Sequence, residues 1–225
     1  MAFQKKGKRN PIMGIDGFEN ILAIGAHPED IEFGCAATLA RFICDRREVH
    51  YMAFSMAKES VKEPWSDDIM EIQAREATER LGIKPGKVLL RDYKVRKLEY
   101  VRQDVLEELV SIREIIHPDL VFLPSIHDLH QDHATVSIEG IRAFRNITVL
   151  GYELPWNNIS FDAEAFVAIS EDHLKTKLYA LDAYESQKYR NYLDADFIRS
   201  VARMRGVQMQ AKYAEAFEVI RWILR

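Results

Sequence analysis

Short apolar runs alternate with segments of helical periodicity along the first two thirds of the chain. Residues 20–26 (NILAIGA) form an apolar run that polar residues bound, and the run is too short for a helix, so it predicts a buried strand. Pro28 follows at a position that a first helical turn tolerates, and residues 31–43 carry apolar side chains at helical spacing. The pattern therefore predicts a strand, a sharp turn and a helix.

The same alternation continues to residue 125. Strands are predicted over 48–56, 87–93 and 118–125, and helices over 66–82 and 102–116. The strand at 118–125 (PDLVFLPS) is almost continuously apolar, as strands of a parallel sheet are when helices cover both faces. Strands that alternate with helices favour right-handed crossovers. We therefore expect an α/β fold with a mostly parallel sheet and helices on both faces.

The C-terminal third continues with elements of both kinds. A helix from about residue 134 to 144 is followed by predicted strands at 148–155 and 165–170 and helices at 171–186 and 194–205. Residues 213–224 alternate enough for a strand, and a helix stays the alternative there. We expect these elements to extend the same sheet, so that residues 1–225 form a single domain, with residues 1–18 as a flexible or irregular N-terminal segment.

Composition narrows the class of protein. The 225 residues are 48% hydrophobic and 29% charged, which is ordinary for a globular protein. A net charge of −4 gives no reason to expect a nucleic-acid partner, because such proteins normally carry a basic face. We find no run of about 18 apolar residues, so we expect no membrane span and a cytoplasmic protein.

Two segments rich in histidine follow predicted strands. Residues 26–30 (AHPED) follow the first strand, and residues 125–133 (SIHDLHQDH) follow the fourth. Ligands of open α/β sheets bind beyond the carboxyl ends of the strands, so the two segments are expected to meet there. His27 and Asp30 are three residues apart and can converge on one point in a first helical turn. Either His130 or His133 can add a third ligand, and two histidines with one carboxylate form a ligand set of catalytic zinc.

Neighbouring carboxylates suit the chemistry of such a site. Glu29 stands beside the two ligands of the first segment, where it can act as the general base for a water molecule. Asp132, between the two histidines, suits the orientation of an imidazole. The simpler interpretation also stands, because acidic residues at a helix N-terminus stabilise the helix dipole without any metal.

These segments resemble the two signatures of the PIG-L/LmbE-like family of zinc-dependent N-deacetylases. The resemblance rests on AHPED with EFGC (32–35) and on HQDH (130–133) after PDLVFLP, and it extends to REATERLG (75–82), YESQ (184–187) and YAEAF (213–217). It implies a Rossmann-like, LmbE-like fold and hydrolysis of an acetamido group, usually on an amino sugar.

Roles of single residues follow from the resemblance, position by position. It implies that His27, Asp30 and His133 are the metal ligands and that Glu29 is the catalytic base. His130, with Asp132 behind it, is implied to stabilise the transition state or to protonate the leaving amine. The sugar-contacting positions are implied to be Arg75 and Asp92, each of which also fits a surface salt bridge or a cap.

The chain departs from the family pattern at two positions. Glu29 stands where the family usually has aspartate, one methylene shorter. Asp128 stands where some members have a tyrosine that donates to the oxyanion, and an ionised carboxylate cannot donate. We assign Asp128 to substrate binding on this positional ground alone.

The functional expectation has two forms. The first is metal-dependent hydrolysis of an N-acetyl group from an amino-sugar-type substrate (a free sugar, a sugar nucleotide or a glycoconjugate), with Zn²⁺ as cofactor and Fe²⁺ as the alternative. The partner would be a small N-acetylated sugar or sugar nucleotide, with no nucleic acid, and a homo-oligomer is left open. The second form is a catalytically silent sugar- or nucleotide-sugar-binding protein on the same scaffold, which only the two departures support and which the intact metal ligands argue against. A nucleotide-cofactor enzyme is disfavoured, since the turn after the first strand lacks G-x-G-x-x-G.

Aromatic residues of the C-terminal third are further candidates for a sugar site, because aromatic faces stack on pyranose rings. The same residues more often belong to a core or an interface. They are Trp156, Tyr179, Tyr184, Tyr189 and Tyr192.

Overall fold

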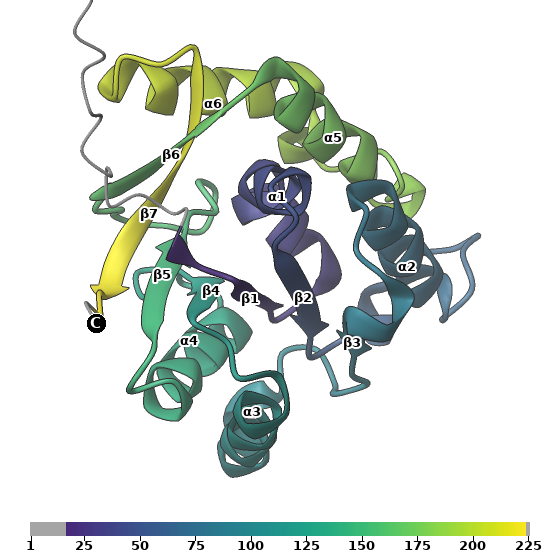
Figure 1. Ribbon diagram of the computed structural model, residues 1–225. Coiled ribbons are helices and arrows are strands. Elements are labelled where there is room, and N and C mark those ends of the chain that lie inside the picture. Colours follow the sequence, from purple (N-terminus) through teal and green to yellow (C-terminus); the bar gives the residue numbers. More distant parts are fainter. Residues whose placement is uncertain (1–16, 224–225) are drawn as a thin grey trace, which may run out of the picture.

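A seven-stranded sheet forms the centre of the molecule. The computed structural model describes residues 17–223, and the strands lie in the order β3-β2-β1-β4-β5-β7-β6 (Figure 1). The strands are β1 (Asn20–Gly25), β2 (Glu48–Ala53), β3 (Val88–Leu90), β4 (Leu120–Pro124), β5 (Thr148–Tyr152), β6 (Ala165–Ile169) and β7 (Tyr213–Arg221).

The sheet is mostly parallel, as the alternation of strands and helices predicts. β1 pairs in parallel with β2 and β4, β2 pairs with β3, and β4 pairs with β5. β7 runs antiparallel to both β5 and β6, so the C-terminal third extends the same sheet and the last segment is a strand rather than a helix. The expected Rossmann-like α/β class is thereby confirmed.

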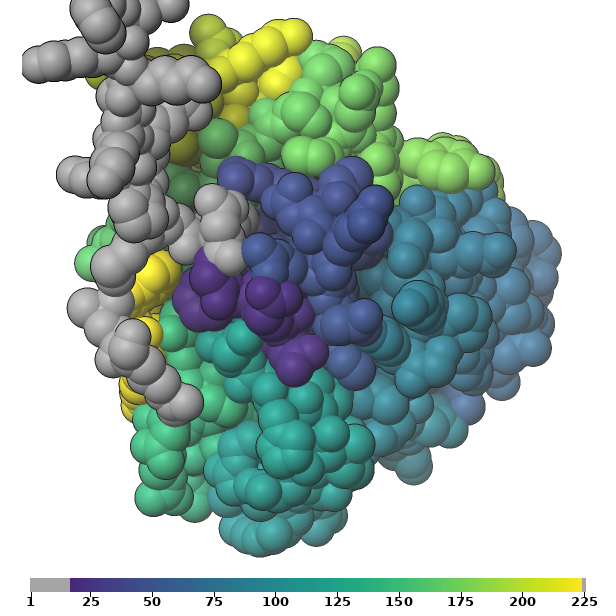
Figure 2. Space-filling model, viewed as in Figure 1, coloured from purple at the N-terminus to yellow at the C-terminus, as the bar shows by residue number. Residues whose placement is uncertain are grey.

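Helices cover both faces of the sheet (Figure 1). One face packs against α1 (Pro28–Cys44), α2 (Ile69–Leu81), α5 (Glu171–Leu181) and α6 (Ala195–Gln208). The other face packs against α3 (Arg102–Ile116) and α4 (Gln131–Ala143). In the space-filling view, the purple and dark-blue N-terminal segments lie between the green and yellow C-terminal segments and the teal central segments (Figure 2).

Three predicted boundaries differ from the structure. β3 covers three residues instead of 87–93, because the chain beyond Leu90 leaves the ladder and forms the loop that precedes α3. α4 begins at Gln131 rather than after residue 134, because His130 caps the helix by accepting the Asp132 N–H. α5 ends at Leu181, and residues 185–187 form a short 3-10 turn. The expectation for residues 1–18 concerns a segment that, up to residue 16, lies outside the described residues.

α1 is buried along most of its length, and one close contact requires a glycine. A Cβ at Gly34 would lie 2.2 Å from Cδ2 of Tyr152, so the Tyr152 ring lies directly on the helix backbone. The Tyr152 hydroxyl donates to the carbonyl oxygen of Ile24 at 3.0 Å. This packing joins β5, α1 and β1 just before the segment that carries His27.

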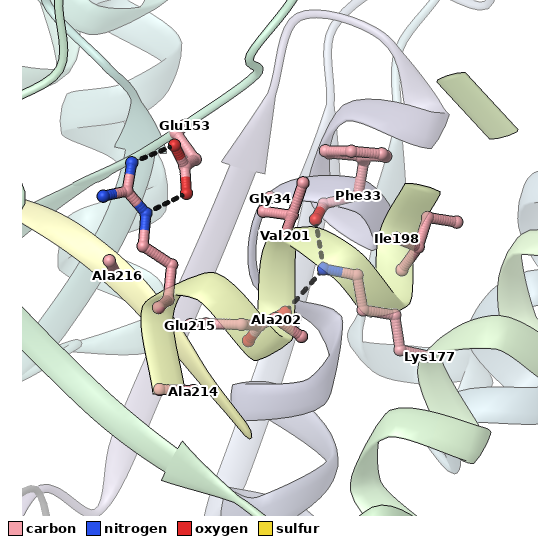
Figure 3. A pocket seen from close by; sticks show the side chains of 11 residues that line it. Phe33, Gly34, Glu153, Lys177, Ile198, Val201, Ala202, Ala214, Glu215 and Ala216 are labelled. Atoms are coloured by element: carbon pink, nitrogen blue, oxygen red, sulfur yellow. Dashed lines mark hydrogen bonds and ion pairs between the residues drawn. The ribbon is translucent and has the colours of Figure 1, made fainter. Parts of the chain in front are cut away.

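A buried ion pair also holds α1 (Figure 3). The Lys177 ammonium on α5 lies 2.7 Å from the Glu215 carboxylate on β7 and donates to the Phe33 carbonyl oxygen. Glu215 in turn accepts the backbone N–H groups of Ala37 at 3.3 Å and Thr38 at 2.7 Å. The ammonium and the carboxylate of this ion pair thus each form hydrogen bonds with the backbone of α1.

Among the described residues, no helix combines the length and the apolar composition that crossing a bilayer requires.

Candidate metal centre

The two histidine-bearing segments begin at the same edge of the sheet. β1 and β4 are parallel neighbours, with Ile21 opposite Leu120, so residues 26–30 and 125–133 both leave carboxyl ends. The turn after β1 is tight: a Cβ at Gly25 would lie 2.7 Å from the His27 carbonyl oxygen. The expected meeting of the two segments is therefore what the structure shows.

Three side-chain atoms of these segments form a small triangle. His27 Nδ1 lies 3.2 Å from His133 Nε2, and Asp30 Oδ2 lies 3.2 Å from His133 Nε2 and 3.4 Å from His27 Nδ1. Ligands placed 2.0–2.2 Å from one tetrahedral zinc ion lie about 3.3–3.5 Å apart. All three side chains are buried. The triangle therefore fits a zinc ion without rearrangement of these atoms.

Each histidine of the triangle has a carboxylate on its other nitrogen. His133 Nδ1 lies 2.7 Å from Asp128 Oδ2, and His27 Nε2 lies 3.2 Å from Asp132 Oδ2. Such carboxylates fix the tautomer and the ring orientation of metal-binding histidines. The donor set thus includes the outer groups that a catalytic metal site normally has.

The cluster carries a surplus of negative charge. Burial lowers the pKa of His27 and His133, but Asp30 and the hydrogen bonds with Asp132 and Asp128 outweigh burial and raise these pKa values to about 9 and about 10. Burial raises the pKa of Asp30, but the two histidines hold it well below its usual range. At neutral pH such a cluster retains either protons or a metal cation.

Glu29 lies at the start of α1 beside the triangle, and its carboxyl group is buried. Among the described residues, Oε2 of Glu29 has no hydrogen-bond partner. Burial and the charge of Asp30 raise the Glu29 pKa, while His27 and Arg190 act in the opposite direction. Burying a carboxylate oxygen without a hydrogen-bond partner costs free energy. A water molecule or a substrate bound at this oxygen would supply the partner.

His130 stands next to the triangle as the N-cap of α4. Its Nδ1 accepts the Asp132 N–H at 3.2 Å, and its ring stacks on His133 with centroids 4.5 Å apart. Burial and the positive charge of His133 and His27 lower the His130 pKa to about 4, so the ring is neutral at pH 7 and carries its proton on Nε2. His27, His130 and His133 also bring one ring nitrogen each within 4.8 Å of one another. The three atoms of the triangle with Asp30 lie closer together, at 3.2–3.4 Å.

Asp132 is completely buried and connects the centre to another loop. Besides contacting His27, its carboxylate accepts the backbone N–H groups of Arg96 at 2.5 Å and Leu98 at 3.2 Å. Burial alone would raise the Asp132 pKa, but the hydrogen bonds with His27 and these amides have the larger effect, so the pKa is lowered. The ionised carboxylate therefore holds the loop after β3 against the centre.

The structure separates the three residues assigned to substrate binding. Arg75 lies on the exposed side of α2, where its guanidinium pairs with Glu71 at 2.7 Å. Asp92 is exposed and pairs with Lys58 at 2.7 Å. Asp128 is buried against the centre, where one oxygen contacts His133 and the other accepts the His130 N–H at 2.8 Å. Of the three, Asp128 alone joins the cluster, and its carboxylate is fully engaged there.

Sequence reasoning did not single out Arg190, whose charge acts on Glu29. Its guanidinium donates to Gln187 Oε1 at 2.6 Å and to the Tyr192 hydroxyl. Tyr192 in turn stacks on Trp156, with centroids 3.8 Å apart. Arg190 lies three residues after YESQ, which was the available signal, but one arginine among many does not reveal a neighbour so distant in the chain.

Two other aromatic candidates contact protein groups elsewhere. Tyr184 is fully buried and donates to Glu32 at 3.0 Å, and Tyr179 lies under the Arg80 guanidinium. Residues 154–158, by contrast, border the cluster. The Leu129 N–H donates to the Asn157 carbonyl oxygen, and Asp128 forms an isolated bridge with Asn158.

Comparison with known proteins identifies a family match that includes both histidine segments. Residues 22–144, which contain both histidine segments, match the PIG-L family, described as GlcNAc-PI de-N-acetylase. The chain is 30% identical over 176 residues to the uncharacterized deacetylase YaiS of Escherichia coli, covering 75% of this chain and 91% of YaiS.

Two solved structures show the same fold. N,N'-diacetylchitobiose deacetylase from Pyrococcus horikoshii superimposes with a TM-score of 0.76 at 21% identity, covering 91% of this chain and 84% of that one. GalB, a 4-carboxy-2-hydroxymuconate hydratase from Pseudomonas putida, has a TM-score of 0.75 at 17% identity, with coverages of 92% and 98%. A deacetylase and a hydratase thus share this scaffold, and the fold alone does not decide the reaction. The family match and the 30% identity do decide the family: the chain belongs to the PIG-L, or LmbE-like, family of deacetylases.

Proposed function

We propose that the protein is a zinc-dependent N-deacetylase that hydrolyses the N-acetyl group of an amino-sugar-type substrate to acetate and a free amine. The supporting observation is the triangle of His27 Nδ1, Asp30 Oδ2 and His133 Nε2 beside the unpartnered Glu29 Oε2. The three ligands would hold the metal, and Fe²⁺ is the alternative ion. A free sugar, a sugar nucleotide and a glycoconjugate all offer the required acetamido group.

When bound, a metal ion would supply Lewis acidity towards the amide oxygen and would lower the pKa of the attacking water towards ~7. Glu29 Oε2 accepts the proton as the water oxygen adds to the acyl carbon. His130 Nε2–H donates a hydrogen bond to the negative charge that develops on the acyl oxygen. As the C–N bond breaks, Glu29 returns this proton to the amine nitrogen, so that acetate and the free amine leave. His130 keeps its orientation because Nδ1 accepts the Asp132 N–H.

The two departures from the family pattern have different consequences. Glu29 carries one methylene more than aspartate, but it lies in the same first turn as the ligand Asp30 and keeps a free oxygen. Asp128 orients His133 instead of donating to the substrate. We therefore assign oxyanion donation to His130 and not to position 128.

Metal analysis with matched variants tests this proposal. We expect about one zinc or iron per chain in the wild type and in Glu29→Gln, and none in Asp30→Ala or His133→Ala. His127→Ala is the matched control, because His127 lies in the same loop but is half exposed, with its Nε2 atom 3.9 Å from the Asp162 carboxylate. It should retain the metal.

Turnover separates the enzyme from the silent binding protein. Glu29→Gln should lose deacetylation of acetamido sugars by about 100-fold or more while it retains metal, since general bases contribute about 10²–10⁴-fold. Equal turnover in Glu29→Gln would remove Glu29 from the base role. A wild type that binds acetamido sugars and metal but never releases acetate would support the silent alternative.

A further inference from the structure

The loop that follows β3 lines a pocket of about 540 Å³. Its volume is within the range of small-molecule sites, about 300–1,000 Å³. The lining residues are Asp92, Tyr93, Lys94, Lys97, Tyr100 and Val101. Only Asp92 among them has a role in the family resemblance.

Backbone hydrogen bonds place this loop against the centre. The Tyr93 N–H donates to the Phe54 carbonyl oxygen just beyond β2, so the loop begins at the carboxyl edge of the sheet. The N–H groups of Arg96 and Leu98 both donate to Asp132, which contacts His27. One loop thus lines the pocket and touches the carboxylate behind a metal ligand.

The pocket has positive charge available for a ligand. Lys58 neutralises Asp92 at 2.7 Å. Within the described part of the chain, the Lys94 ammonium has no ion pair or hydrogen bond, and the contact recorded for the Lys97 ammonium is with the Tyr100 ring, at 5.0 Å from its centroid. Two such lysines in a protein of net charge −4 favour an anionic group.

Aromatic surface forms the other part of the lining. Tyr100 is 72% exposed, so its ring is accessible to a ligand. The Tyr93 hydroxyl donates to Glu108 at 3.1 Å, so this phenol already has a partner within the protein. Rings next to ammonium groups suit a ligand that joins a planar ring to phosphate.

We propose that this pocket binds the nucleoside diphosphate part of a sugar-nucleotide substrate, with the diphosphate on Lys94 and Lys97 and the base on Tyr100. The inference rests on the proposed function, which places the acetamido group at the metal centre. It selects the sugar nucleotide from the three substrate classes that share that group.

Calorimetric titration of the full-length, metal-free protein with uridine diphosphate tests the pocket without any deacetylation. A chelator keeps the nucleotide from binding metal. We expect saturable binding that weakens about 10-fold or more in Lys94→Ala/Lys97→Ala, and that also weakens in Tyr100→Ala. The matched control is Lys84→Ala/Lys175→Ala, which removes the same charge from two other exposed positions and should bind as the wild type does.

Inorganic pyrophosphate in parallel titrations isolates the contribution of the base. Pyrophosphate should bind more weakly than the nucleotide and should be insensitive to Tyr100→Ala. Equal binding of both ligands would overturn the nucleotide assignment. Absence of nucleotide binding, or equal loss in the control variant, would overturn the pocket itself. Either result leaves the proposed function standing if the wild type holds zinc and releases acetate. Nucleotide binding in a protein that holds no zinc and releases no acetate would refute the proposed function but not the pocket.

Discussion

The ion pair between Lys177 and Glu215 offers the sharpest test of how the fold holds α1. Both side chains are at most 6% exposed, and Glu215 also accepts two amides of α1. Removing one member of a buried pair leaves the other charge uncompensated, which costs about 3–5 kcal/mol. We therefore expect Glu215→Gln and Lys177→Met each to lower the free energy of unfolding by about that amount, or the midpoint temperature by roughly 6–20 °C for a chain of this length.

The double variant Lys177→Met/Glu215→Gln distinguishes charge burial from packing. It removes both charges, and the glutamine oxygen can still accept an α1 amide. We expect its unfolding free energy to lie within about 1–2 kcal/mol of the wild type, because neutral replacements of buried pairs are often nearly neutral. The assay is urea unfolding of the metal-free protein, since bound metal would add its own stabilisation. Lys175→Met, which breaks an exposed pair with Asp172, should change little. Single variants that lose less than about 1 kcal/mol, or that add up in the double variant, would refute the reasoning.

Three further predictions concern α1 and the metal centre. Gly34→Ala should destabilise the protein by about 1–3 kcal/mol in the same unfolding assay, because its Cβ would overlap the Tyr152 ring; an unchanged midpoint would contradict the packing. Asp128→Asn should weaken zinc binding about 10–100-fold in chelator competition, since it weakens the support of His133, and wild-type affinity would show that Asp128 does not support this ligand. Zinc affinity should rise between pH 6 and 9, because the pKa values of His27 and His133 are raised and their protons must leave before zinc binds. The stability that these protonated histidines give the metal-free protein should be complete below about pH 6.5 and should be lost as the pH rises through about 9 and 10. A zinc affinity that does not depend on pH would contradict this reasoning.

The sequence predicts the fold and the meeting of the two histidine segments because both depend on general patterns. Apolar periodicity locates the strands, and parallel neighbours bring their carboxyl ends together wherever the loops go. Residues 87–93 show the limit of periodicity, since β3 keeps only three of them and the remainder forms the loop beside the centre. The end of a strand depends on which backbone groups find partners elsewhere, and here those partners are on β2 and Asp132.

The side-chain partners of the site were less accessible to sequence reasoning. Glu215 lies in a segment whose alternation left strand and helix open, and its buried carboxylate has its cation 38 residues away on α5. Position 128 marks a family departure, but only the structure shows that its oxygens contact His133 and the His130 N–H. Arg190 acts on Glu29 from a distant part of the chain. Neither the pairing of Glu215 with Lys177 nor that of Arg190 with Glu29 has a local spacing that would reveal it.

Asp132 and Asp128 each connect the proposed metal centre to a different loop, Asp132 through its carboxylate and Asp128 through its backbone. Asp132 joins His27 to the loop after β3 through the amides of Arg96 and Leu98. Asp128 orients His133 while its own backbone bridges to Asn158 in the other loop. Because these links use carboxylates and main-chain groups, the side chains of both loops are free to change without moving a ligand. Substitutions at Lys94, Lys97 or Tyr100 should therefore alter which substrates bind while the affinity for the metal stays constant. Substitutions at Asp128 or Asp132 should instead reduce the affinity for the metal, and with it the turnover of every substrate.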